Sequence, residues 1–175
     1  MATDGITGQV PVLSYLEFTP AVGADVVLAG SAFLVGKVRI AGPAVLRDSA
    51  VLRGDQNWID VGPRFHIGQR STIHVELDTS TKVGADVWIG DDAVVHACML
   101  GDGVRVEDGG LVLSNSRVGA GSIVDQDALV PEGVEFPENS FISGTPGRRL
   151  RDTTPQERAE TRQHIADEYS RVSRA

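Results

Sequence analysis

The sequence predicts an all-β solenoid, a parallel β-helix of about seven coils, that ends in an α-helix. From Val83 to Thr145 a Val, Ile, Leu or Phe opens each word of roughly six residues, as in VGADVW, IGDDAV and LGDGVR. This period fits neither an α-helix, with about 3.6 residues per turn, nor a long strand with its period of about two. The 20 glycines and 5% aromatic residues suit a narrow aliphatic core with frequent tight corners. A sandwich of short strands is the alternative, but its turns usually recur every 8 to 12 residues or so.

The N-terminal part, residues 1–21, is expected to cap the first coil and protect its open β edge. It carries Pro11 and Pro20, shows no steady period, and includes the stretch VPVLSYLEF, which we expect to form an opening strand. The six-residue words begin at Val22, and we assign the β-helix domain to residues 22–150.

The repeat is interrupted in two places and shortened in a third. The register slips over Trp58–Asp60 and again over about Asp78–Lys82, and we expect both segments to be loops that leave a corner of the coil. Such loops either carry function or are harmless insertions. The word Val95–Met99 has five residues instead of six and contains a histidine, so we expect function there.

The C-terminal part, residues 151–175, is predicted to be a helix that ends near Val172. Thr154 is a suitable N-cap, Pro155 suits the first helical position, and Glu157 completes a capping box. A modest apolar stripe is expected to pack along the solenoid or on a neighbouring chain; it comprises Ala159, Ile165, Ala166, Tyr169 and Val172. His164 is expected on the helix surface.

Charge and cysteine content limit the function classes. The formal net charge of −8 argues against nucleic acid and acidic membranes as partners. The start of the chain, MATDGITGQV, has neither a basic nor an apolar targeting segment, so we expect a cytoplasmic protein. The single cysteine, Cys98, excludes an intramolecular disulfide and is expected to be a small buried apolar residue rather than a nucleophile.

Two histidines occupy the same place in words one coil apart. His74 and His96 both stand second in their words, so we expect them on the same side of the coil, about 5 Å apart. Two imidazoles at that separation can share a metal, and Asp91 and Asp92 lie nearby in the sequence. The pair is therefore our candidate for a metal or catalytic site.

The chain resembles the gamma-class carbonic anhydrase family, which consists of trimers built on a left-handed parallel β-helix with a C-terminal helix. The resemblance rests on AVLRGDQN, IGQRSTIH, VWIGDDAVVHACMLGD and ISGTPGRRLR, and it covers nearly the whole chain from about Val22. It implies a left-handed coil, a homotrimer, and zinc at each subunit interface, held by two histidines of one chain and one of its neighbour.

Two of the three implied ligand positions match His74 and His96, whereas the third is occupied by Asp91. Arg53 and Asp55 match the residues that form an interface ion pair in the family, where they also serve for anion binding. The positions at which the family orients the bound water are held instead by His66, Gly68 and Gln69.

Three functional interpretations remain open. In the first, His74, His96 and Asp91 bind zinc or iron, and the protein is a lyase or hydratase acting on carbon dioxide or a small carboxylated metabolite. In the second, the site works without metal, with a histidine as general base, Arg53 as carboxylate ligand and Glu76 as proton carrier.

In the third interpretation, the chain is a coenzyme A-dependent acyltransferase of the same hexapeptide superfamily, or a catalytically silent relative. The coenzyme phosphates would then need basic ligands. The only basic cluster near the end of the repeats consists of Arg148, Arg149 and Arg151.

Overall fold

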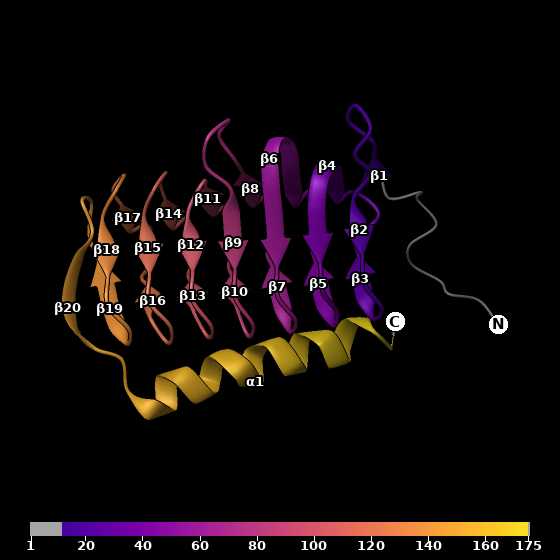
Figure 1. The fold of residues 1–175 in the computed structure, drawn as a ribbon. Helices are drawn as coiled ribbons and strands as arrows, with labels where there is room; N and C mark the ends of the chain where they lie inside the picture. Colours follow the sequence, from indigo (N-terminus) through magenta and orange to yellow (C-terminus); the bar gives the residue numbers. More distant parts are fainter. Residues whose placement is uncertain (1–11, 175) are drawn as a thin grey trace.

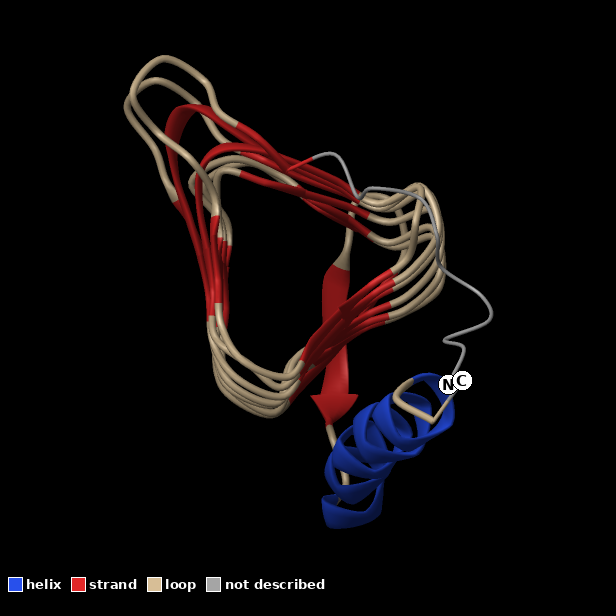
Figure 2. Cartoon of the chain, turned by 90° about the vertical axis from the view of Figure 1, so that its right-hand side faces the viewer, coloured by secondary structure: helices blue, strands red, loops and turns tan. Residues whose placement is uncertain are grey.

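The computed structural model describes residues 12–174 and shows a parallel, left-handed β-solenoid of about seven turns with one C-terminal helix (Figure 1). Viewed along its axis the coil is a triangle, with short strands on its three sides and turns at its corners (Figure 2). The predicted fold class is confirmed.

Two of the three sides share one sheet. We call the first side the histidine face, and its strands are β1 (Val12–Leu13), β8 (Thr72–His74), β11 (Val94–His96), β14 (Leu111–Val112) and β17 (Leu129–Val130). The second is the charged face, with β2 (Ala21–Val22), β9 (Thr81–Val83), β12 (Met99–Leu100), β15 (Arg117–Val118) and β18 (Glu135–Phe136). Strands β4 (Phe33–Ile40) and β6 (Val51–Val61) belong to both faces.

The third side is a separate sheet, which we call the helix face. Its strands are β3 (Val26–Leu28), β5 (Ala44–Leu46), β7 (Phe65–Ile67), β10 (Trp88–Ile89), β13 (Arg105–Val106), β16 (Ile123–Val124), β19 (Ser140–Ser143) and β20 (Arg148–Asp152). All its pairs are parallel except β19 with β20, where the chain turns back toward the helix.

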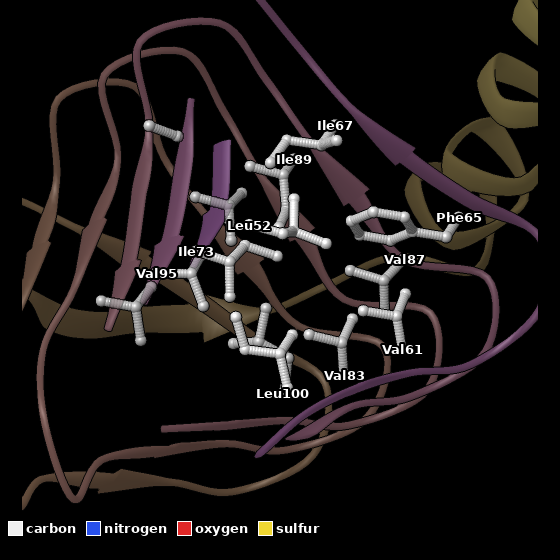
Figure 3. Packing of buried hydrophobic residues seen from close by; sticks show 14 of the residues in the cluster. Leu52, Val61, Phe65, Ile67, Ile73, Val83, Val87, Ile89, Val95 and Leu100 are labelled. Atoms are coloured by element: carbon white, nitrogen blue, oxygen red, sulfur yellow. The ribbon is translucent and has the colours of Figure 1, made fainter. Parts of the chain in front are cut away.

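The residues that open the six-residue words fill the axis of the coil (Figure 3). Most of them are at most 5% exposed; these include Val83, Ile89, Val95, Leu100, Val106, Val112, Val118, Val124, Val130 and Ile142. Each coil therefore places its aliphatic residues directly over those of the coil before it. This continuous column buries apolar surface along the whole solenoid and fixes the register of every turn.

The predicted loop at Trp58–Asp60 is wrong. Strand β6 extends from Val51 to Val61, and its pairing with β4 shifts by three residues, from Gly36 opposite Gly54 to Val38 opposite Ile59. After this shift β6 pairs with both β4 and β9. The added residues lengthen the strand around the corner, because Ile59 and Val61 find backbone partners there. The second interruption does form a loop, but it lies earlier than predicted, between the end of β8 at His74 and the start of β9 at Thr81, so Thr81 and Lys82 belong to a strand.

Helix α1 (Pro155–Val172) begins as predicted and lies lengthwise outside the helix face (Figures 1 and 2). Thr154 and Glu157 form the full capping box, with Pro155 in the first turn. Of the predicted apolar stripe only Ile165 is buried, and Arg47 of the solenoid forms an ion pair with Glu168 of the helix. Within residues 12–174, no helix combines the length and the apolar character needed to cross a bilayer.

Candidate functional site

His74 and His96 lie directly opposite each other in neighbouring parallel strands. β8 pairs with β11 so that the Cα of His96 faces that of His74, and the two ring centroids are 5.1 Å apart. Both side chains are partly exposed on the histidine face. The chain bends at Ala97, in the middle of the five-residue repeat; its φ of 44° is left-handed and its amide donates to the carbonyl of His74.

The Nε2 atom of His74, which points away from His96, contacts a carboxylate. Nε2 of His74 lies 3.0 Å from Oδ1 of Asp55, and the other oxygen of Asp55 lies 3.5 Å from Nε of Arg53. Arg53 also pairs with His74 in the sheet register. Partial burial opposes the charge of Asp55, but the hydrogen bond from His74 and the charge of Arg53 outweigh it and lower the pKa of Asp55. For His74, burial is the main cause of a lowered pKa.

The outer nitrogen of His96 is held by a second polar chain. Nδ1 of His96 lies 2.9 Å from Oγ of Ser114, and that hydroxyl donates to Oε1 of Glu76 over 2.6 Å. Ser114 is 6% exposed, whereas the side chain of Glu76 is 46% exposed on the loop that follows β8. Asp55, His74, His96, Ser114 and Glu76 thus form one continuous chain of polar contacts.

These contacts determine which ring nitrogens carry hydrogen. A carboxylate can only accept, so the neutral His74 must donate from Nε2 to Asp55 and keeps a lone pair on Nδ1. Ser114 has one hydrogen, which it gives to Glu76, so it accepts from Nδ1 of His96. His96 then keeps a lone pair on Nε2. For neutral rings, these assignments leave a lone pair on both Nδ1 of His74 and Nε2 of His96, which lie 3.1 Å apart.

Asp91, the third predicted ligand, lies apart from this cluster within the chain. It follows β10 at the corner between the helix face and the histidine face, where its Oδ1 accepts from the amide of Gln69 at 2.8 Å. A Cβ on Gly68 would lie 2.4 Å from the same oxygen, so this corner needs glycine. Within residues 12–174 of one chain, no three His, Cys, Asp or Glu side chains gather as a metal site.

His66, which stands where water-orienting residues were expected, lies on the helix face away from the two paired histidines. It is 3% exposed, stacks on Trp88 with ring centroids 3.7 Å apart, and its Nδ1 lies 3.2 Å from the carbonyl of Ile89. Burial lowers the pKa of His66 to about 4. His66 is therefore a neutral packing residue beneath α1.

Other sequence expectations concern single residues. Cys98 is buried, and burial raises the pKa of its thiol to about 12, which leaves it protonated and unreactive. His164 is exposed on α1, as predicted. Arg149 and Arg151 form ion pairs with Asp152 and Glu157, so two arginines of the candidate coenzyme cluster already have carboxylate partners.

Comparison with known proteins identifies the family. The chain is 31% identical over 176 residues to mitochondrial gamma carbonic anhydrase 1 of Arabidopsis thaliana, an alignment that covers 94% of this chain and 62% of that protein. It is 26% identical to protein YrdA of Escherichia coli, covering 89% of this chain and 88% of that one. This chain belongs to the gamma-carbonic-anhydrase-like hexapeptide-repeat family.

Membership of this gamma-carbonic-anhydrase-like family agrees with the solved structures. A hexapeptide transferase family protein from Anaplasma phagocytophilum superposes with a TM-score of 0.87 at 28% identity, covering 94% of this chain and 96% of that one. The chain spans only 55% to 62% of the length of the Arabidopsis gamma carbonic anhydrases. No family model matches the sequence.

Sequence reasoning found four members of the polar chain but missed Ser114. The position within the six-residue repeat predicts that the neighbour of His96 in the next coil is Leu113, because β11 and β14 pair Val95 with Val112. The structure instead places Ser114, one residue further along the chain, between His96 and Glu76. No spacing rule in the sequence signals that contact.

Proposed function

We propose that the protein is a metal-dependent lyase or hydratase that acts, as a homotrimer, on carbon dioxide or a small carboxylated metabolite. The metal would be zinc, with iron as the alternative, held by His74 and His96 of one subunit and by Asp91 of the next. The observation that carries the proposal is the 3.1 Å separation of Nδ1 of His74 and Nε2 of His96, the two nitrogens that keep a lone pair when Asp55 and Ser114 hold the other nitrogen of each neutral ring.

The donor atoms fit a metal ion in their chemistry and spacing. Two imidazole nitrogens that share a tetrahedral zinc, each about 2.0–2.1 Å from it, lie about 3.3–3.4 Å apart. The facing nitrogens of His74 and His96 are 3.1 Å apart. Each ring also has its other nitrogen held by a polar partner, which is the usual arrangement around a metal-bound histidine. A cation between the rings would remove the repulsion between the two lone pairs.

A homotrimer would supply the third ligand that one chain lacks. The histidine face carries a row of outward, partly exposed and mostly apolar side chains beside the site; it consists of Phe33, Val51, Thr72, Val94, Leu111 and Leu129. Such a row next to a polar site suits burial against another protomer. Asp91 sits at an outer corner of the coil, from which it can approach a neighbouring chain.

The chain's own residues have distinct tasks in this proposal. A bound zinc would supply a water whose pKa is lowered toward about 7. Asp55 holds His74 in the required tautomer and orientation. Arg53, whose side chain is 53% exposed, offers a guanidinium to an anionic substrate or product. Glu76 places an exposed carboxylate next to the histidines, where it can pass a proton to solvent.

Asp91 in place of a neutral histidine changes the expected activity. An anionic ligand reduces the effective charge of the metal, so the bound water is less acidic than at a site of three histidines. We therefore propose weak carbon dioxide hydration, with a small carboxylated metabolite as the alternative substrate.

The buried free thiol of Cys98 fits a reducing compartment, and we place the protein in the cytoplasm.

Metal analysis of the purified protein tests this proposal. We expect about one zinc or iron per chain, threefold association by light scattering, and loss of the metal in His96→Ala. His164→Ala is the matched control, because it removes an exposed histidine from α1 and should leave the metal content unchanged. A protein that takes up no metal from zinc- or iron-supplemented buffer would contradict the proposal.

A coenzyme A-binding assay separates the acyltransferase alternative. A ligand that binds only the folded protein raises its melting temperature. Because two of the three arginines in the candidate cluster are already ion-paired, we expect no stabilisation by coenzyme A. A clear rise in melting temperature in the metal-free protein would favour an acyltransferase instead.

A further inference from the structure

We infer that Ser114 and Glu76 act together as positioning residues that fix the tautomer of His96, so that the lone pair of Nε2 points at His74. The importance of this tautomer for metal binding rests on the proposed function, but the tautomer itself does not. Neither residue is one of the proposed metal ligands.

The inference follows from the single hydrogen of a serine hydroxyl. Oγ of Ser114 lies 2.6 Å from the Glu76 carboxylate, a short contact typical of a hydroxyl that donates to a charged acceptor. The same oxygen lies 2.9 Å from Nδ1 of His96. Since its hydrogen is already given to Glu76, Ser114 must accept there, and Nδ1 must carry the hydrogen of a neutral His96. Glu76 thus acts on the ring through Ser114.

The loop that carries Glu76 is held in the position this role requires. The amide of Glu76 donates to the carbonyl of Thr79 at 3.0 Å, which closes a turn at the start of the loop. The side chain of Asn57 donates to the carbonyl of Leu77 at 3.1 Å, and the hydroxyl of Thr79 donates to the side chain of Asn115 at 3.0 Å. The carboxylate is therefore placed beside Ser114 before any ligand arrives.

Removal of the Glu76 carboxylate should move the ring hydrogen of His96 from Nδ1 to Nε2. In Glu76→Ala the hydroxyl of Ser114 has no carboxylate to donate to, so it donates to Nδ1 of His96 instead. His96 then carries its hydrogen on Nε2 and donates it to Nδ1 of His74 across the 3.1 Å gap. The two histidines would then be hydrogen-bonded to each other, and Nε2 of His96 would no longer have a lone pair for a metal.

The test is nitrogen-15 NMR of histidine-labelled, chelator-treated full-length protein, at a pH well above the ordinary histidine pKa of about 6.5. Protonated and unprotonated ring nitrogens resonate far apart, so the spectrum reports each tautomer directly. We expect His96 to be protonated on Nδ1 in the wild type and on Nε2 in Glu76→Ala. In Ser114→Ala we expect the Nε2-protonated form to emerge, because Nδ1 loses its direct partner.

Ser116→Ala is the matched control. Ser116 is buried like Ser114 and two residues away, but its hydroxyl donates to the carbonyl of Leu113, so its removal should leave both histidine tautomers unchanged. In a separate zinc titration, Glu76→Ala and Ser114→Ala should each weaken binding by roughly ten- to a hundredfold, as expected for residues behind a metal ligand. Ser116→Ala should bind as the wild type does.

The outcomes separate this inference from the proposed function. If wild-type His96 carries its hydrogen on Nε2, or if Glu76→Ala leaves the hydrogen on Nδ1, the inference is wrong whatever the metal content. If the tautomers are as expected but the wild type binds no zinc or iron, the inference stands and the proposed function fails. The wild-type spectrum needs no variant, so the test does not depend on the folding of a mutant.

Discussion

Replacement of His66 by phenylalanine should remove a large part of the acid sensitivity of the fold. His66 lies beneath α1, stacked on Trp88, and its burial lowers its pKa to about 4. In the unfolded chain its pKa returns to about 6.5. Between these two pKa values the imidazole is protonated in the unfolded state and neutral in the folded state, so the free energy of unfolding falls as the pH falls.

The size of the effect follows from the two pKa values. A fall from 6.5 to about 4 corresponds to about 3 kcal/mol of differential stability, fully lost only below pH 4. By pH 5 the contribution is about 2 kcal/mol. Above pH 7 the group is neutral in both states and contributes no pH dependence. His74, whose pKa burial also lowers, adds a loss of the same sign in the wild type and in the variant.

Urea unfolding at pH 7.5 and pH 5, at one protein concentration, measures this difference. His66→Phe keeps a ring stacked on Trp88, and the carbonyl of Ile89 retains the amide of Gly68 as a partner at 2.8 Å. We expect the wild type to lose about 2 kcal/mol more than the variant between these pH values. Equal losses in the two proteins would show that His66 is protonated in the folded state or lies exposed, and would refute the reasoning.

Two further substitutions test the core and the helix start. Ile73→Ala should reduce the free energy of unfolding by about 2–5 kcal/mol in urea titrations, because Ile73 is fully buried between Leu52 and Val95 in the aliphatic column; a change below about 1 kcal/mol would contradict that packing. Thr154→Ala should lower the free energy of unfolding by about 1 kcal/mol, measured by thermal unfolding, because it removes the hydroxyl that accepts from the amide of Glu157. The exposed helix residue Gln163 provides a control substitution to alanine, for which we expect a smaller effect.

The fold could be predicted because each six-residue word specifies its own place in the coil. An aliphatic residue such as Val95 points to the axis, and the parallel pairing of strands places the corresponding residue of the next coil, here Val112, beside it. The Trp58–Asp60 segment defeated this reasoning. The break in the six-residue register predicts a loop there, but whether added residues leave the coil or extend a strand depends on backbone partners in β4 and β9, which are distant in the sequence.

The site could be predicted only in part. The matching places of His74 and His96 were sufficient to pair them, because parallel strands preserve the position within a word. The role of Ser114 depends on the path of a loop and on the strained turn at Ala97, which word counting cannot represent. Whether Asp91 joins the site depends on a second subunit, and its bond to the amide of Gln69 shows that it also has a structural task within the chain.

Anomalous diffraction from a crystal grown with zinc tests the central claim most directly. Data collected on both sides of the zinc absorption edge should place one anomalous peak per chain between Nδ1 of His74 and Nε2 of His96. We predict that an oxygen of Asp91 from an adjoining protomer lies within bonding distance of that peak. A zinc-soaked crystal with no peak between these two nitrogens, or with the two rings hydrogen-bonded to each other instead, would contradict the account.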